Sequence, residues 1–415
     1  MLASRVSPAK PFIRTSTQGP DFMKVVSLLI LSILSVAMCA DAQTGRQAAQ
    51  KPAAASYLIA NDDLPGKVAA TSGSFYAIAS DGSLQTPARV SLGGSGLGGG
   101  YFTATRVSVL QGSTQACAYL SLGGASEVGA VDINAQQDVG NFGGASSDVG
   151  TDNGIGLANN GTYLYASFST SNTIATFAIQ PGCGLSFLGD ISVIGKHLGH
   201  AKGMAVHGNI LVVAYGDGSI ESFDVSSGIP VSHGDLQNAT GYTVDCFPTG
   251  VDISQDGRYA IFGDVSVVTT VEVSDISSGK LTKSVLYNLG TEQNSDNVYL
   301  SPDNTLLYIA NTGTGKITAA FFDKTSGKVT RGCTSGILKG FDNRWVFLAG
   351  LATELNTGTG SVLYVAEYGL TSGVAVVNVT SSGGTCSLVE AATSPVSDPN
   401  STSLLSIGVY PPRSF

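Results

Sequence analysis

The 415-residue sequence predicts an all-β fold built from repeated small antiparallel sheets, and three observations carry this prediction. After residue 42, no stretch of about ten residues or more has the apolar spacing of a helix. Residues 297–330 contain three apolar strands separated by turns such as Ser301-Pro302-Asp303-Asn304, whose residue types favour a β-turn. The middle strand of this stretch, 306–310, is apolar throughout, so further copies of the unit must cover both of its faces.

The copies recur along the chain at a regular spacing. When the middle strands are aligned on their fourth residues, successive anchors are separated by 61, 46, 47, 48, 48 and 56 residues. The anchors are Ala60, Ser121, Ser167, Ala214, Phe262, Ala310 and Ala366. A period of roughly 47 residues in strand-rich repeats is typical of propeller blades. The sequence therefore predicts a seven-bladed β-propeller of four-stranded antiparallel blades.

Apolar runs between turn residues place three strands in each of blades two to seven. In chain order they are 105–109, 116–120, 128–133; 154–158, 163–168, 173–179; 203–206, 210–215, 219–225; 250–253, 259–263, 267–273; 297–300, 306–310, 317–322; and 347–352, 362–367, 374–379. The first blade, from 57 to about 90, is incomplete, and the C-terminal strand 403–410 has no neighbours of its own. We expect these N- and C-terminal strands to pair, which closes the ring and removes two open sheet edges.

Residues 1–42 are predicted to be a secretory signal peptide. Lys24 precedes an apolar run at 25–37, and Ala40-Asp41-Ala42 is a small-x-small cleavage signal before Gln43. Because Met23-Lys24 is the usual opening of such a peptide, residues 1–22 are interpreted either as a mis-called upstream start or as a long basic n-region of the signal peptide. The run is shorter than the roughly 20 residues of a membrane span. We therefore expect an exported protein, periplasmic or extracellular, with a flexible leader at 43–56, a single propeller at 57–415 and no stable membrane span after cleavage.

Charge and cysteine content narrow the class of partner and the compartment. The net charge is −9, which argues against a nucleic-acid backbone as partner. The cysteines beyond the leader are Cys117, Cys183, Cys246, Cys333 and Cys386. An exported protein can form disulfides, but five cysteines leave at least one thiol over and the sequence does not fix the pairing. They are interpreted as local staples or as small buried hydrophobic residues.

Two stretches carry the same pattern of turn and strand: SPDNTLLYIANTGTGKITAAFFDKTSGKVT at 301–330, and FPTGVDISQDGRYAIFGD at 247–264. With these motifs the chain resembles the lactonase-type seven-bladed propellers, which include 6-phosphogluconolactonase-like and carboxymuconate-lactonizing proteins. It is also similar to the YVTN-type propellers of cell surfaces. The resemblance covers about residues 57–411. It implies a site at the mouth of the central channel, where the relatives often carry Pro-His-Gly or His-x-His with Arg and Glu nearby.

The positions that match this mouth are polar in the present chain. They are Thr105, Asn153, Lys202, Thr249, Asp296 and Ala349. Pro248-Thr249-Gly250 stands where the relatives have Pro-His-Gly, and Lys202 stands in place of a histidine. Because the histidine pattern is missing, we favour an exported propeller that binds a ligand or partner.

The alternative function is hydrolysis of a lactone at the channel mouth. In that reaction His200 or Asp245 would activate water, and Lys202 or Arg344 would stabilise the developing oxyanion. Under either function, Asn153, Thr249, Asp296 and Trp345 are the candidate ligand-binding residues.

No metal or cofactor is expected. The pair His197-x-x-His200 has neither a helix nor a third ligand near it in sequence. A formal G-x-G-x-x-G at Gly94, Gly96 and Gly99 is followed by a strand-like segment instead of the helix that a dinucleotide site requires. The expected partner is a small anionic or carbonyl-bearing ligand or a component of the cell envelope, and the expected state is a monomer.

Overall fold

The computed structural model describes residues 56–62, 72–96, 104–144, 154–193, 200–234, 250–264, 268–341, 347–356, 360–368, 373–398, 404 and 406–413. All of them belong to one unit, Ala54–Phe415. The predicted signal peptide and the leader up to residue 55 lie outside the described residues. Within the described part of the chain, no helix has the length and apolar character needed to cross a membrane.

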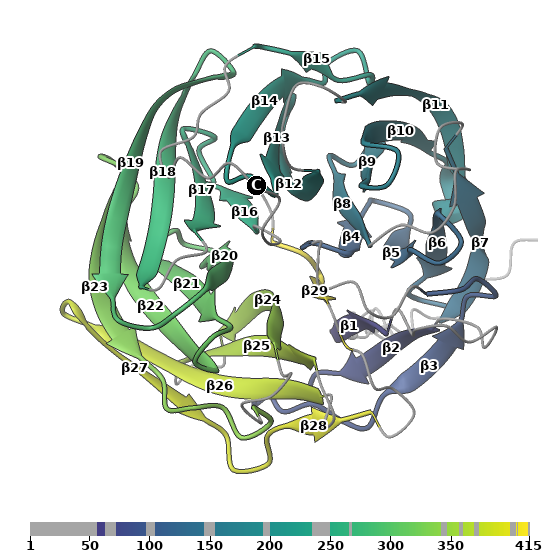
Figure 1. Ribbon diagram of the computed structural model, residues 1–415. Helices are drawn as coiled ribbons and strands as arrows, with labels where there is room; N and C mark the ends of the chain where they lie inside the picture. Colours follow the sequence, from purple (N-terminus) through teal and green to yellow (C-terminus); the bar gives the residue numbers. More distant parts are fainter. Residues whose placement is uncertain are drawn as a thin grey trace, which may run out of the picture. The chain divides into compact units, whose positions relative to one another are not determined.

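The strands of the described residues form seven antiparallel sheets, which confirms the seven-bladed propeller (Figure 1). The innermost strand of each blade contacts the innermost strands of both neighbouring blades, so these strands close a ring around the axis. From blade one to blade seven they are β29 (Ser406–Tyr410), β4 (Val107–Gln111), β8 (Ile155–Asn159), β12 (Ala201–His207), β16 (Val251–Ile253), β20 (Ser295–Leu300) and β24 (Phe347–Asn356).

The remaining strands follow outward in each blade, joined by turns. The second strands are β1 (Tyr57–Asn61), β5 (Ala116–Leu122), β9 (Tyr163–Phe168), β13 (Ile210–Tyr215), β17 (Tyr259–Asp264), β21 (Leu306–Asn311) and β25 (Ser361–Tyr368). The third strands are β2 (Ser72–Ala77), β6 (Glu127–Asp132), β10 (Thr173–Ile179), β14 (Ile220–Asp224), β18 (Thr269–Ser277), β22 (Lys316–Asp323) and β26 (Gly373–Ser382). The outer strands are β3 (Ala88–Ser91), β7 (Gln137–Gly143), β11 (Leu185–Ser192), β15 (Val231–Ser232), β19 (Lys280–Gly290), β23 (Lys328–Thr334) and β27 (Thr385–Glu390).

Two short elements complete the described structure. The strand β28 (Val396–Ser397) pairs with β26 and gives blade seven a fifth strand, which the sequence did not predict. A short 3-10 helix, η1 (Pro181–Cys183), lies between β10 and β11.

The first blade is closed by the two ends of the propeller, as the sequence predicts. β29 pairs antiparallel with β1 over its whole length, from Tyr410 opposite Tyr57 to Ser406 opposite Asn61. β29 also contacts β4 of blade two and β24 of blade seven. The C-terminal strand therefore fills the innermost position of a blade whose other three strands come from the N-terminal side.

The second strands are the most deeply buried part of each blade. Every residue of β21 and of β5 is buried, which confirms the prediction that both faces of the 306–310 strand are covered. Apolar side chains of adjacent blades interdigitate, and a separate buried cluster fills each of the seven interfaces between blades. Stacking of one blade on the next therefore provides the core that a single blade lacks.

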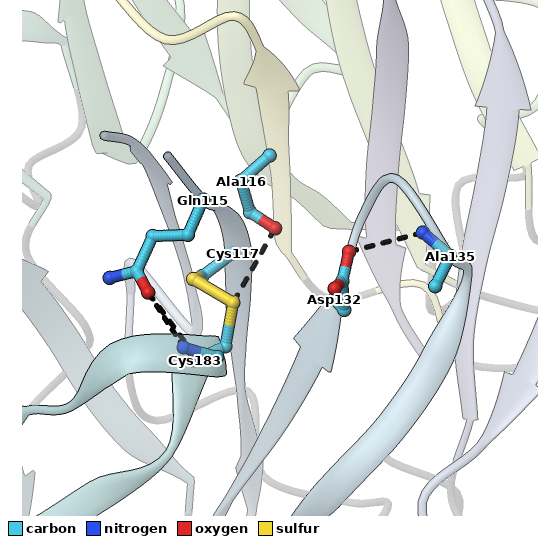
Figure 2. The surroundings of a disulfide bond; sticks show 7 residues. Gln115, Ala116, Cys117, Asp132, Ala135 and Cys183 are labelled. Atoms are coloured by element: carbon cyan, nitrogen blue, oxygen red, sulfur yellow. Dashed lines mark hydrogen bonds between the residues drawn. A yellow bond between two sulfur atoms is a disulfide. The ribbon is translucent and has the colours of Figure 1, made fainter. Parts of the chain in front are cut away.

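Two disulfides join neighbouring blades in the described residues. Cys117 of β5 bonds to Cys183 of η1 and links blades two and three, and Cys333 of β23 bonds to Cys386 of β27 and links blades six and seven. Figure 2 shows the first bond, with the side-chain carbonyl of Gln115 accepting the Cys183 amide. The bonds close loops of 66 and 53 residues, a length at which loop-closure entropy is worth about 4 kcal/mol per bond. Cys246 lies outside the described residues.

Candidate functional site

The innermost strands begin at one end of the ring, and contacts between blades align these starts. The amide of Leu157 donates to the carbonyl oxygen of Thr105 at 2.8 Å, which joins blade three to blade two. The amide of Gly250 donates to the carbonyl oxygen of Asp296 at 2.7 Å, which joins blade five to blade six. We call the residues at these starts the entrance ring; its described members are Thr105, Arg106, Gly154, Lys202, Gly250 and Asp296.

Three innermost strands carry an irregularity at this end. The pairing registers of β12, β20 and β24 each shift across one residue, and these residues are Lys202, Asp296 and Ala349. All three are positions that the sequence alignment of the blades singled out. A β-bulge bends its strand and re-aims a side chain, and bulges are over-represented beside functional sites. The repeated bulge marks this end of the ring as the candidate site.

Arg106 is a member of the entrance ring that the sequence analysis missed. Its side chain is fully buried, and its backbone amide donates to the hydroxyl of Ser406 at 3.0 Å. A β-carbon at Gly154 would lie 2.4 Å from Arg106 Cζ, so the guanidinium occupies the space beside the start of β8. Gly154 also has a φ of +97°, a conformation that side chains with a β-carbon rarely adopt. Two separate constraints therefore require glycine at this position.

Lys202 lies on the other side of β8. Its side chain is 2% exposed, and its carbonyl oxygen would lie 2.5 Å from a β-carbon placed on Gly156. Glycine at 156 thus lets blade four approach blade three closely. A buried ammonium or guanidinium is tolerated only where polar groups surround it. Arg106 and Lys202 therefore place two buried basic side chains in the entrance ring of a protein whose net charge is −9.

Asp296 supplies the acidic member of the entrance ring. It is 3% exposed, and its carboxylate accepts a hydrogen bond from the hydroxyl of Thr312. The amide of Thr312 in turn donates to the carbonyl oxygen of Asn294 at 2.9 Å, which ties the carboxylate to the turn after β21. The side chain is therefore held in place by its own blade.

Of the eight candidate site residues from the sequence, the structure describes three. Lys202 and Asp296 belong to the entrance ring. His200 lies directly before β12 and is partly buried. The backbone amide of Gly216 donates to the carbonyl oxygen of His200 at 3.0 Å. The other five lie outside the described residues: Asn153, Asp245, Thr249, Arg344 and Trp345.

A cavity of about 640 Å³ extends along the axis from the entrance ring toward the opposite end of the innermost strands. It is lined by residues of β4, β8, β12, β16, β20 and β29, and by Pro412 and Arg413 of the C-terminal segment. At that far end, the side-chain amide of Asn160 donates to the carbonyl oxygen of Gly208 at 3.4 Å, linking the turns after β8 and β12. The cavity is therefore built by most of the blades together.

The C-terminal segment crosses the ring, which the sequence analysis also missed. Figure 1 shows it leaving β29 in blade one and passing across the middle toward β16. There Arg413 donates to both carboxylate oxygens of Asp252, at 2.6 and 3.0 Å, and to the carbonyl oxygen of Leu300 at 2.8 Å. Its guanidinium also stacks over Tyr299, with 5.1 Å between Cζ and the ring centre. Burial opposes the charge, but Asp252 outweighs it and raises the pKa of Arg413.

No cluster of three or more His, Cys, Asp and Glu side chains suited to a metal ion occurs among the described residues. The charged members of the entrance ring among the described residues, Arg106, Lys202 and Asp296, come from three different blades. An arrangement of two buried cations and one tethered carboxylate can bind an oxygen-rich molecule and polarise a carbonyl group.

The sequence by itself has no detectable relatives in two comparisons: no family model matches it, and no curated protein does. Solved structures do match. A protein from Bacteroides fragilis, provisionally assigned as a 6-phosphogluconolactonase, has a TM-score of 0.59 at 13% identity over 86% of this chain and 98% of its own. The periplasmic gluconolactonase of Pseudomonas aeruginosa has a TM-score of 0.58 at 15% identity over 83% and 97% of the two chains.

A functionally unknown protein from Desulfotomaculum acetoxidans is similar to the same degree, with a TM-score of 0.59 at 12% identity over 85% and 98% of the two chains. Identities this low establish the fold and leave the activity open. The chain thus has the seven-bladed fold of the 6-phosphogluconolactonase-like propellers.

Proposed function

We propose that the protein is an exported propeller that binds a small anionic or carbonyl-bearing molecule at the entrance ring. The observation that carries this proposal is the burial of two basic side chains, Arg106 and Lys202, on either side of β8. Basic groups held away from water bind carboxylate or carbonyl oxygens more strongly than surface lysines do. The bulge at Lys202 supports this role, because it sets that residue apart from the regular pairing of β12.

Export is part of the same proposal. It is supported by the signal-peptide pattern of the first 42 residues and by the Cys117–Cys183 and Cys333–Cys386 bonds, since disulfides persist in oxidising compartments. A cell-envelope component remains the second class of partner, and it would meet the outer surface of the ring.

Hydrolysis of a lactone is the second candidate function, and the position of His200 two residues before Lys202 favours it. In this reaction the imidazole of His200 would take a proton from water as the water oxygen attacks the lactone carbonyl. The ammonium of Lys202 would stabilise the oxyanion until the ring C–O bond breaks and the proton passes to the leaving alkoxide. Asp245 and Arg344 are the alternative base and cation from the sequence.

Titration calorimetry with gluconate and glucono-1,5-lactone tests the proposal. Lys202→Met keeps the length of the side chain and removes its charge, so we expect affinity to fall by roughly tenfold or more, as for loss of a hydrogen bond to a charged group. Lys202→Arg should retain most of the affinity. Lys283→Met, at an exposed position of β19, is the matched control and should bind as the wild type does.

The outcomes separate the two functions. Binding without turnover supports the binding propeller, and lactone turnover that disappears in Lys202→Met supports the hydrolase. Unchanged affinity in a folded Lys202→Met protein contradicts a site at the entrance ring.

A further inference from the structure

The axial cavity differs in chemistry from the entrance ring. Its volume of about 640 Å³ lies within the range of small-molecule sites, roughly 300–1,000 Å³. Valine, leucine, isoleucine, alanine, methionine and proline make up half of its lining residues, and neutral polar residues and glycines lie between them. Val109, Ala205 and Tyr299 line it and remain only partly buried, so apolar surface is available there. The burial of this apolar surface by a bound ligand would favour binding.

The charges in the wall cancel. Among the lining residues that the structure describes, Asp252 and Arg413 are the charged ones, and they form a two-pronged ion pair with each other. Asp252 also accepts the backbone amides of Ile253 and Leu300, both at 2.8 Å. A charged ligand would have to compete with this ion pair and these amide hydrogen bonds, which disfavours an ionic ligand in the cavity.

One neutral polar side chain of the wall, that of Asn159, is likewise hydrogen-bonded within the protein. The side-chain amide of Asn159 donates to the hydroxyl of Ser108 at 2.8 Å and to the carbonyl oxygen of Val109 at 3.1 Å. The carbonyl oxygen of the same side chain accepts the amide of Gly161 at 3.2 Å. These bonds satisfy the side chain of Asn159, so the partly buried apolar side chains of the wall are its contacts for a neutral ligand.

We infer that the axial cavity is a second binding site, separate from the entrance ring, that takes an uncharged and largely apolar small molecule. The C-terminal segment forms part of its wall: Pro412 and Arg413 line the cavity, and the ion pair with Asp252 holds them across the ring. The inference goes beyond the proposed function, because the cavity shares only Thr105 with the described members of the entrance ring and the two ligands differ in charge.

Fluorescence titration with N-phenyl-1-naphthylamine, an uncharged dye that brightens in apolar surroundings, tests this site on the full mature chain. The wild type should bind the dye in a saturable manner. Ala205→Phe places a ring in the cavity and should abolish binding. The matched control is Ala178→Phe, at a partly buried position of β10 that does not line the cavity. It should bind the dye as the wild type does.

A second series tests the neutrality of the wall and does not depend on filling the cavity. Arg413→Met leaves the carboxylate of Asp252 uncompensated at the wall, so dye affinity should fall by about tenfold. Asp252→Asn combined with Arg413→Met removes both charges and should restore it. Lys202→Met should bind the dye normally even where it loses gluconate, which separates this site from the entrance ring. A wild type without saturable binding, or full affinity in both Ala205→Phe and Arg413→Met, overturns the inference.

Discussion

At the end of β25, the carboxyl group of Glu367 is fully buried beneath Gly340. Burial raises its pKa to about 8, and the negative charge of Glu390 adds to the shift. The backbone amide of Gly340 and the charge of Lys339 offset part of it. At neutral pH the group is therefore largely protonated in the folded protein and ionised in the unfolded chain, where the pKa of a glutamate is about 4.5.

This difference predicts a pH dependence of stability. Between about pH 4.5 and 8 the folded state holds a proton that the unfolded state has lost, so the free energy of unfolding falls as pH rises, by up to about 1.4 kcal/mol per pH unit. Below pH 4.5 both states are protonated, and above 8 both are ionised. Glu367→Gln stays neutral throughout, and we expect its melting temperature to decline less across this window than that of the wild type. Parallel melting profiles would contradict the burial of an ionisable group here.

The element that the ring depends on most is β29, the innermost strand of blade one. Deleting residues 403–415 removes its pairing with β1 and its contacts to β4 and β24, and exposes two sheet edges. We expect aggregation or a large loss of melting temperature. Removing only residues 413–415 keeps the strand and breaks the pair between Arg413 and Asp252, which should cost about 3–5 kcal/mol because it leaves a buried carboxylate uncompensated.

Melting curves and size-exclusion chromatography distinguish the two truncations. The protein that lacks only residues 413–415 should remain monomeric with a lower melting temperature. Adding Asp252→Asn to this deletion should recover part of the lost melting temperature. A protein that lacks residues 403–415 and is still monomeric with an unchanged melting curve would show that β29 does not close the ring.

The individual strands differ in how well the sequence predicts their first and last residues. β9, β10 and β13 have the bounds predicted from apolar runs, because their side chains are buried over most of their length. The start of β4 lies at Val107 and not at the predicted Thr105, since Thr105 and Arg106 belong to the entrance ring. The outer strands could not be placed: most residues of β7 are exposed or half-buried and β15 has two residues, so neither carries an apolar pattern.

For the whole molecule, the repeat predicts the fold and aligns equivalent positions, and this alignment singled out Lys202 and Asp296, where the pairing registers of β12 and β20 shift. Arg106 was missed because it falls inside the predicted strand 105–109, and its burial beside Gly154 of the next blade leaves no local pattern. Arg413 was missed because its partner Asp252 is 161 residues away in sequence and meets it only across the closed ring. Contacts of this kind, between residues that are distant in the sequence, leave no local pattern. They can therefore be identified only from the three-dimensional structure.

The proposed small-molecule site lies where the innermost strands begin. A crystal structure of the protein with gluconate would show directly whether the ligand binds there. We predict ordered ligand density at the entrance ring, with carboxylate or hydroxyl oxygens within hydrogen-bond distance of Lys202 or Arg106. Gluconate that binds in solution and lies on the outer surface of the blades in the crystal, with the entrance ring empty, would contradict the claim.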